Sequence, residues 1–162
     1  MLLEVEHLQL ELRDFSGGEK GHVRILANTT AISGALPSAL AGFLAANPGV
    51  SIDLRERLSH EIVLALRESL ADIGLVAGNV DTSGLEVQDF VPDELVLVVP
   101  LNHRLAANEA VPFAETLTEP HISLAEGSAL ASFLPPLARA AGWPLAFRIQ
   151  VTSFESICLL VE

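Results

Sequence analysis

The fold is decided by residues 23–78, which read VRILANTTAISGALPSALAGFLAANPGVSIDLRERLSHEIVLALRESLADIGLVAG. Residues 23–26 and 73–77 are short and almost wholly apolar, as the buried strands of a parallel sheet are. Residues 50–57 alternate between apolar and polar side chains and predict a third strand. In the two segments between these strands, the apolar residues recur at helical spacing. The order strand, helix, strand, helix, strand makes two βαβ units, which predicts an α/β fold with helices on the faces of a parallel sheet.

The two helices of this stretch have recognisable beginnings. The first is predicted over residues 36–46, with Ser33 or Gly34 as its N-cap. Pro37 is compatible with the first turn, because no intrahelical N–H bond is lost there. Ser59 is predicted to cap the second helix, whose apolar residues share one face: Val63, Leu66 and Leu70.

A second section of the chain repeats this alternation less clearly. Residues 85–90 alternate and predict a strand, and residues 95–99 are so apolar that they predict a central strand. Two more strands are predicted over residues 121–124 and 145–151. Residues 103–119 are polar and predict short helical pieces.

The last two helices are predicted from their caps and their prolines. A polar turn at residues 126–128 precedes a helix that contains Pro135 and Pro136, which predict either a kink or a restart with Pro135 at the first helical position. Gly142 ends this helix. Thr152 and Ser153 cap a final helix with an apolar side of Phe154, Ile157, Cys158 and Val161, so Cys158 is predicted to be a buried small hydrophobe.

The first fifteen residues predict an amphipathic helix, because apolar side chains recur at heptad spacing at Met1, Val5, Leu8, Leu12 and Phe15. Residues 16–18, Ser-Gly-Gly, would end it. A strand is the weaker alternative. As a helix, this segment is either a surface helix that covers the domain or the end of a longer dimerising helix.

Composition excludes several classes of protein. The 162 residues are 50% hydrophobic, enough for one domain or two small lobes and too apolar for a disordered acidic tail. Nine Lys and Arg against 21 Asp and Glu give a net charge of -12, which disfavours contact with nucleic acid. The longest apolar run, residues 95–101, is far too short to span a membrane. Glu4 and Glu6 argue against a secretory signal, and the lone Cys158 suits the cytoplasm.

The sequence lacks recognisable catalytic motifs, so the protein is not expected to be an enzyme. It has neither a nucleophile motif nor a Walker-type loop, so no cofactor is predicted. The five histidines stand singly and without metal-ligand spacing: His7, His22, His60, His103 and His121. Small polar residues instead occupy three strand-to-helix turns, 28–30, 126–128 and 152–153. Plain helix capping explains any one of them, whereas all three together suggest a ligand cleft between two lobes.

One set of residues, in its order and spacing, resembles the effector-binding domain of LysR-type transcriptional regulators. The resemblance runs from about residue 21 to residue 162 and rests on Leu36-Pro37, Leu40, Phe43, Asn47-Pro48, Val50, Leu54, Leu66, the run from Asp72 to Leu75, the run from Leu95 to Pro100, His103, Leu105, the run from Pro120 to Ile122, Gly127-Ser128, Val151, Ser153, Glu155, Ile157 and Leu160-Val161.

The resemblance implies a two-lobe α/β domain like the type 2 periplasmic binding proteins, with crossing strands and an effector between the lobes. It implies the end of a linker helix at residues 1–18, a first lobe at 19–94, and a crossing strand with an incomplete second lobe at 95–162. The chain would then be truncated before the closing segment of the first lobe. DNA would be bound only by a helix-turn-helix domain absent from this sequence.

The resemblance also implies site residues. Effector contacts would come from Thr29, Thr30, Ser33, Gly78, Asn79, Ser123, Glu126, Gly127, Ser128, Thr152, Ser153 and Phe154. Their hydroxyls and N–H groups suit a small carboxylate or similar polar metabolite, although these turns hold no Arg to clamp a carboxylate and Glu126 would repel an anion. A homodimer or homotetramer would be built by Leu36, Leu40, Phe43, Arg55, Leu137, Ala141 and Arg148.

Three functions remain open at this point. The first is a metabolite-sensing domain of a dimeric transcription regulator, in which effector binding alters DNA-binding geometry. The alternative is a solute-binding protein of a transport system with the same fold, which the absent signal disfavours. An enzyme of the same architecture is disfavoured because no acid, base or metal set converges.

Overall fold

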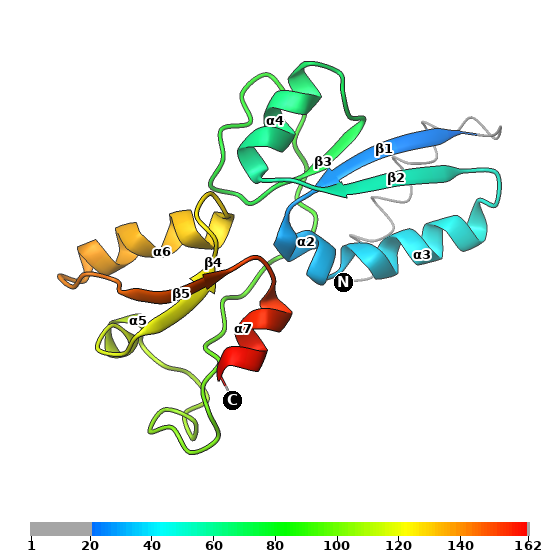
Figure 1. Cartoon of the computed structure of the whole chain (residues 1–162). Coiled ribbons are helices and arrows are strands. Elements are labelled where there is room, and N and C mark those ends of the chain that lie inside the picture. The colour runs from blue at the N-terminus through cyan, green and yellow to red at the C-terminus, as the bar shows by residue number, and fades with distance from the viewer. Residues whose placement is uncertain (1–20, 162) are drawn as a thin grey trace. The chain divides into compact units, whose positions relative to one another are not determined.

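The computed structural model describes residues 21–161 and divides into two compact units, of which the first ends at Asp93 and the second begins at Glu94. We call the described part of the first unit, residues 21–93, the first lobe and that of the second, residues 94–161, the second lobe (Figure 1). The helix predicted over residues 1–15 lies outside the described residues.

The first lobe is built on a three-stranded parallel sheet in the order β2-β1-β3. Its strands are β1 (His22–Ala27), β2 (Ser51–Glu56) and β3 (Ile73–Leu75). Ile25 of the central strand pairs with Leu54 on one side and with Ile73 on the other. The predicted parallel sheet is therefore confirmed, with each crossover made by helices.

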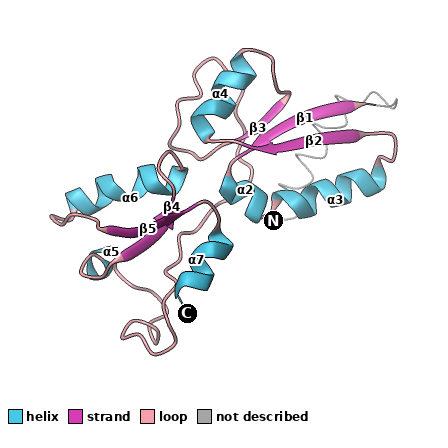
Figure 2. Ribbon diagram, viewed as in Figure 1, coloured by secondary structure: helices cyan, strands magenta, loops and turns pink. Residues whose placement is uncertain are grey.

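Three helices belong to this lobe: α2 (Thr29–Ser33), α3 (Leu36–Ala46) and α4 (Ser59–Arg67), with α3 and α4 drawn on either side of the sheet in Figure 2. Leu36, Leu40 and Phe43 of α3 are buried against Val23 and Ile25 of β1 in one apolar cluster. Alternate residues of β1 reach this cluster because successive side chains of a strand point to opposite faces.

The helix caps differ from the predicted ones. Asn28, not Ser33 or Gly34, is the capping side chain: its Oδ1 accepts from the Ala31 N–H at 2.9 Å and starts the short helix α2. Helix α3 follows without a side-chain cap, with Pro37 in its first turn as predicted. Asn28 stands directly before α2, where the first backbone N–H groups of the helix have no intrahelical acceptor. Its side chain therefore caps α2.

Ser59 is also not the cap that was predicted. It is the first residue of α4, and its Oγ accepts from the Ala77 N–H at 3.3 Å. The Glu61 carboxylate accepts from the Leu58 N–H at 3.0 Å at the helix start. The Ser59 hydroxyl therefore ties α4 to the segment that follows β3.

An ion pair joins β1 to the start of β3. Asp72 Oδ2 accepts from the backbone N–H of Arg24 at 2.8 Å, and Oδ1 accepts from its Nη2 at 2.8 Å. The Arg24 guanidinium lowers the pKa of the Asp72 carboxyl below its usual 3.8, first through the side-chain hydrogen bond. The ionised carboxylate is therefore favoured in the folded state.

Asp72→Asn is expected to lower the free energy of unfolding at pH 7 by about 1–2 kcal/mol, because Arg24 loses a charged acceptor. Since the folded-state pKa is depressed, this stabilisation is present above pH 3.8 and is lost as pH falls through the folded-state pKa. Urea titrations at pH 7 and at pH 3 measure it, and the variant should differ less from wild type at pH 3.

Asp53→Asn is the matched control, because Asp53 also pairs with an Arg, Arg55 at 2.7 Å, but both side chains of this pair are more exposed than Asp72 and Arg24. Solvent screens such pairs, so little change is expected. Equal losses in the two variants would contradict a special contribution of Asp72.

The second lobe contains two parallel strands, β4 (His121–Leu124) and β5 (Phe147–Val151), and the helices α5 (Phe113–Thr116), α6 (Ala129–Ala140) and α7 (Phe154–Val161). Its buried apolar residues are Leu105, Leu117, Leu124, Leu134 and Ala138. Ser128 caps α6 by accepting from the Ala131 N–H at 3.2 Å. Ser153 caps α7 as predicted, accepting from the Ser156 N–H at 3.2 Å.

Two predicted strands do not form in the described structure. Residues 85–90 and 95–99 are irregular, and no backbone–backbone hydrogen bond joins residues 86–99 to another described residue. Val96, for example, is 71% exposed. A strand persists only where a neighbour pairs its N–H and C=O groups, so apolar composition was insufficient here.

Helix α6 runs through Pro135 and Pro136 without a break, so the predicted restart is wrong. Gly142 follows the helix with φ of 82°, the left-handed conformation that glycine accepts. Cys158 is exposed, so its predicted burial is also wrong. Helix α7 has no buried residue, and Cys158 lies outside the half-buried face made by Phe154, Ile157 and Val161.

Candidate functional site

Backbone hydrogen bonds bring the carboxyl ends of all three first-lobe strands together. The Asn28 N–H, just after β1, donates to the Leu75 carbonyl of β3 at 3.1 Å. The Arg57 N–H, just after β2, donates to the Ala27 carbonyl of β1 at 3.0 Å. We call this region, with the residues that follow each strand, the first-lobe edge. In parallel α/β sheets, ligands bind at this end of the strands.

Several predicted effector residues lie at the first-lobe edge. Thr29 and Thr30 open α2 half-buried, Ser33 ends it exposed, and Gly78 and Asn79 follow β3 in exposed positions. The Thr29 hydroxyl donates to Glu56 Oε1 at 2.6 Å, which joins α2 to the end of β2.

Three residues at this edge were missed from the sequence: Glu56, Arg57 and Ser59. Glu56 and Arg57 are the last two residues of the alternating segment 50–57. Two charged residues at the end of a predicted strand were the signal in the sequence that could have identified them. Ser59 was assigned to capping, although its hydroxyl bonds to the Ala77 N–H.

The second lobe has an equivalent edge. The Ala125 N–H, just after β4, donates to the Val151 carbonyl at the end of β5 at 2.7 Å. The predicted turn of residues 126–128 follows, with Gly127 at φ of 89°. A residue with a Cβ is strained in that conformation, so glycine permits the tight turn into α6. We call residues 125–128 and 152–154 the second-lobe edge.

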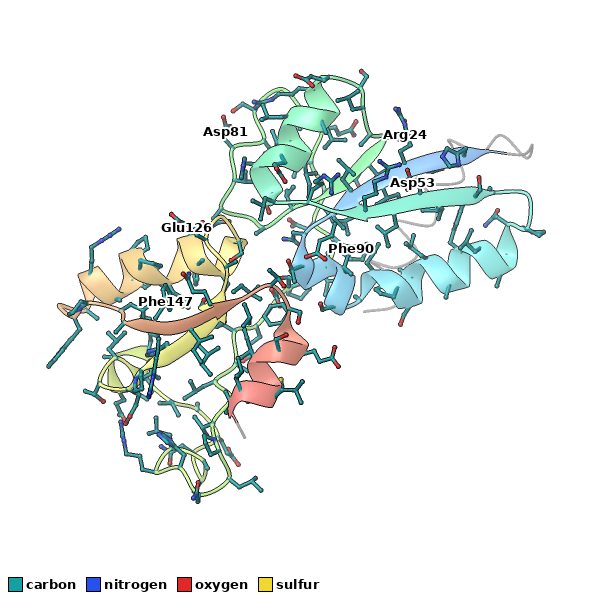
Figure 3. The ribbon with its side chains drawn as sticks, viewed as in Figure 1. Arg24, Asp53, Asp81, Phe90, Glu126 and Phe147 are labelled. Carbon is teal, nitrogen blue, oxygen red and sulfur yellow. The ribbon has the colours of Figure 1, made fainter. Side chains whose placement is uncertain are left out.

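The hydroxyls of the second-lobe edge are used in different ways. Ser128 and Ser153 accept from helix N–H groups, whereas Thr152 is exposed without a described partner for its side chain. Glu126, labelled in Figure 3, is exposed, and Phe154 is half-buried. Ser123, inside β4, is 1% exposed, and its Oγ has no hydrogen-bond partner among the described residues. Buried polar groups are rarely left so.

No group of three or more His, Cys, Asp or Glu side chains in residues 21–161 is placed to hold a metal ion. His121 Nε2 and Thr116 Oγ1 form a hydrogen bond of 3.2 Å within the second lobe.

The predicted dimer residues separate into two groups. Leu36, Leu40 and Phe43 are buried in the core of their own lobe, in one cluster with residues of β1, so they present little surface to a partner. Arg55 is exposed and paired with Asp53. The second-lobe residues Leu137, Ala141 and Arg148 are exposed, and Leu137 is 42% accessible.

A comparison with protein families matches residues 16–162 to the LysR substrate binding domain. The chain belongs to this family. Its LysR relatives include the HTH-type transcriptional regulator CysL of Bacillus subtilis, 28% identical over 115 residues that cover 71% of this chain and 38% of CysL. The uncharacterized HTH-type transcriptional regulator MJ0300 of Methanocaldococcus jannaschii is 32% identical over 120 residues, 74% of this chain and 40% of that protein.

Solved LysR structures share the fold. HinK, a LysR family transcriptional regulator from Pseudomonas aeruginosa, superposes with a TM-score of 0.67 at 24% identity, over 99% of this chain and 55% of HinK. The effector binding domain of QuiR in complex with shikimate gives 0.75 at 17% identity, over 88% of this chain and 69% of that domain. The predicted family and the two-lobe α/β fold class are thus confirmed.

This LysR chain spans between about a third and a half of the length of the curated relatives it matches. None of the helices described over residues 21–161 has the length and apolar character to cross a membrane.

Proposed function

We propose that this chain is the effector-binding and dimerisation part of a cytoplasmic transcription regulator. The observation that carries this is the pair of strand-end edges, each lined by small polar residues beside a helix start. Such residues hold a small polar molecule through hydroxyl and N–H groups, and a ligand that prefers one conformation shifts the protein toward it.

The family relatives favour a regulator over the solute-binding alternative. Both CysL and MJ0300 are named as HTH-type transcriptional regulators. A net charge of -12 makes these 162 residues unsuited to phosphate contacts. We therefore assign DNA binding to a helix-turn-helix part outside this chain.

The effector residues remain those proposed from the sequence, with Thr30 of the first-lobe edge as the most direct test. Thr30 is half-buried, and its side chain has no hydrogen bond to another described residue, so its removal costs little internal structure. A panel of sugars, amino acids, nucleosides and organic acids, shikimate included, is screened by thermal shift on the whole chain. A bound effector should raise Tm by several degrees at concentrations far above Kd.

Thr30→Ala should weaken the binding of the stabilising compound roughly 2- to 10-fold, the value of one hydrogen bond. Ser38→Ala is the control, because Ser38 is exposed on α3 and is not one of the residues assigned to either edge. If the effector binds wild type and Thr30→Ala with equal affinity, the assignment of Thr30 to the effector site is contradicted. A panel with no stabilising compound would count against effector binding itself.

We also propose that the chain is dimeric or tetrameric through the exposed face of the second lobe. Leu137, Ala141 and Arg148 keep their proposed role there, and Phe133 and Trp143, 47% and 54% exposed, extend the apolar character of that lobe's surface. Sedimentation velocity tests the assembly, and a monomer at every concentration would contradict it.

A further inference from the structure

Arg57 is fixed at the first-lobe edge by the backbone rather than by its own charge. Its N–H donates to the Ala27 carbonyl at 3.0 Å, immediately before Asn28 and Thr29. Within residues 21–161, it is the one cationic residue that directly follows the end of a strand. The Arg57 backbone, from which the guanidinium extends, therefore lies at the same strand end as the residues proposed to contact the effector.

Most of the guanidinium of Arg57 is free to bind a ligand. Its Nη1 donates to the Glu56 carbonyl at 2.8 Å, and the residue is exposed. Arg24, Arg55, Arg67 and Arg104 each lie within ion-pair distance of a carboxylate, whereas Arg57 has no such partner among the described residues. Its remaining N–H donors point to no described acceptor, and a carboxylate can accept two of them side by side.

The neighbouring Glu56 carboxylate increases the need for a positive charge at this edge if the ligand is an anion. Glu56 Oε1 is held by the Thr29 hydroxyl at 2.6 Å, at the same edge. An anionic ligand that reaches Thr29 therefore comes close to a negative charge. Arg57 is the positive charge adjacent in sequence that offsets this repulsion.

We propose that Arg57 binds a carboxylate of the effector and so restricts this site to organic acids. The inference rests on the proposed effector-binding function and deepens it by naming the ligand class. It also corrects the expectation from sequence that no Arg is available near the turns: Arg57 is distant from the 28–30 turn along the chain, but its N–H is bonded to the Ala27 carbonyl directly before that turn. A bidentate Arg–carboxylate contact supplies both energy and geometry.

The test compares acids with their uncharged esters on the whole chain. Succinate, citrate, 2-oxoglutarate, lactate and benzoate, each beside its methyl ester, are screened by thermal shift against wild type, Arg57→Gln and Arg55→Gln. Arg55→Gln removes the same charge two residues away, from an Arg already paired with Asp53. We expect at least one acid to raise Tm while its ester does not.

For that acid, Arg57→Gln should weaken binding roughly 10- to 100-fold by calorimetry, and Arg55→Gln should change it little. Stabilisation by esters as strong as by acids, or equal affinity in wild type and Arg57→Gln, would overturn the assignment of Arg57 while leaving effector binding intact. If neither acids nor esters stabilise wild type, but a neutral metabolite of the broader panel does, the inference fails alone. If nothing in either panel stabilises it, the proposed function fails with it.

Discussion

Phe43→Ala is expected to lower the free energy of unfolding of this chain by about 3–5 kcal/mol, the largest loss of any single substitution considered. Phe43 is 1% exposed and lies in the apolar cluster that joins α3 to β1. Truncation removes the aromatic contacts and leaves a cavity between helix and sheet, which the close-packed surroundings fill only in part.

The matched control is Leu44→Ala, one residue along the same helix. Leu44 is 37% exposed and is not part of the buried cluster, so its loss should cost far less. Both substitutions create alanine inside α3, and the larger gain in helix propensity expected for Phe43→Ala, less than about 0.7 kcal/mol, works against the predicted difference. The difference between the variants therefore isolates burial.

Urea unfolding followed by far-ultraviolet circular dichroism and by fluorescence measures both variants. The single tryptophan, Trp143, lies in the second lobe, whereas circular dichroism senses the helices of both lobes. Equal free energies of unfolding for Phe43→Ala and Leu44→Ala would show that the described core is not what stabilises the first lobe.

Gly74→Ala is expected to cost about 1–3 kcal/mol, the typical penalty for overfilling a packed core. Gly74 lies in β3, and a Cβ built there would stand 2.5 Å from Ile62 Cγ2 and 2.6 Å from Leu66 Cδ1, both in α4. Ile62 is fully buried and so has little room to move. The absence of a side chain at position 74 is what allows α4 to lie close against the sheet.

Gly78→Ala provides the comparison, because a Cβ there meets nothing within 4 Å. Its stability should stay near that of wild type. Thermal melts of the two variants and wild type make the measurement. If Gly74→Ala has the same Tm as wild type, α4 lies farther from β3 than described, and the close contact at position 74 is contradicted.

Most of the first lobe could be predicted because its signals are local. Residues 23–26 and 36–46 carry the strand and helix periods in adjacent residues, and the structure forms β1 and α3 there. The caps were less predictable. Asn28, Ser33 and Ser59 all favour helix starts, and which of them caps depends on which N–H group is free nearby.

The predicted strand at residues 95–99 shows where local reasoning stops. Its composition favours extended backbone, yet strand formation depends on a partner distant in sequence. The same limit applies to α3. Helical spacing correctly grouped Leu36, Leu40 and Phe43 on one face, but only the tertiary structure shows that this face is filled by β1 rather than by another subunit.

The sequence by itself determined the α/β class, the parallel first-lobe sheet, the family and the polar turns at the strand ends. The reason is that periodicity, proline and glycine positions and turn residues act over a few residues of chain. The tertiary structure alone decided that Glu56 contacts Thr29 and that Arg57 is bonded to Ala27, since the sheet brings together strand ends that are 27 residues or more apart in sequence. The charge that the proposed acid-binding edge needs was always in the sequence, but only strand pairing placed it at the site.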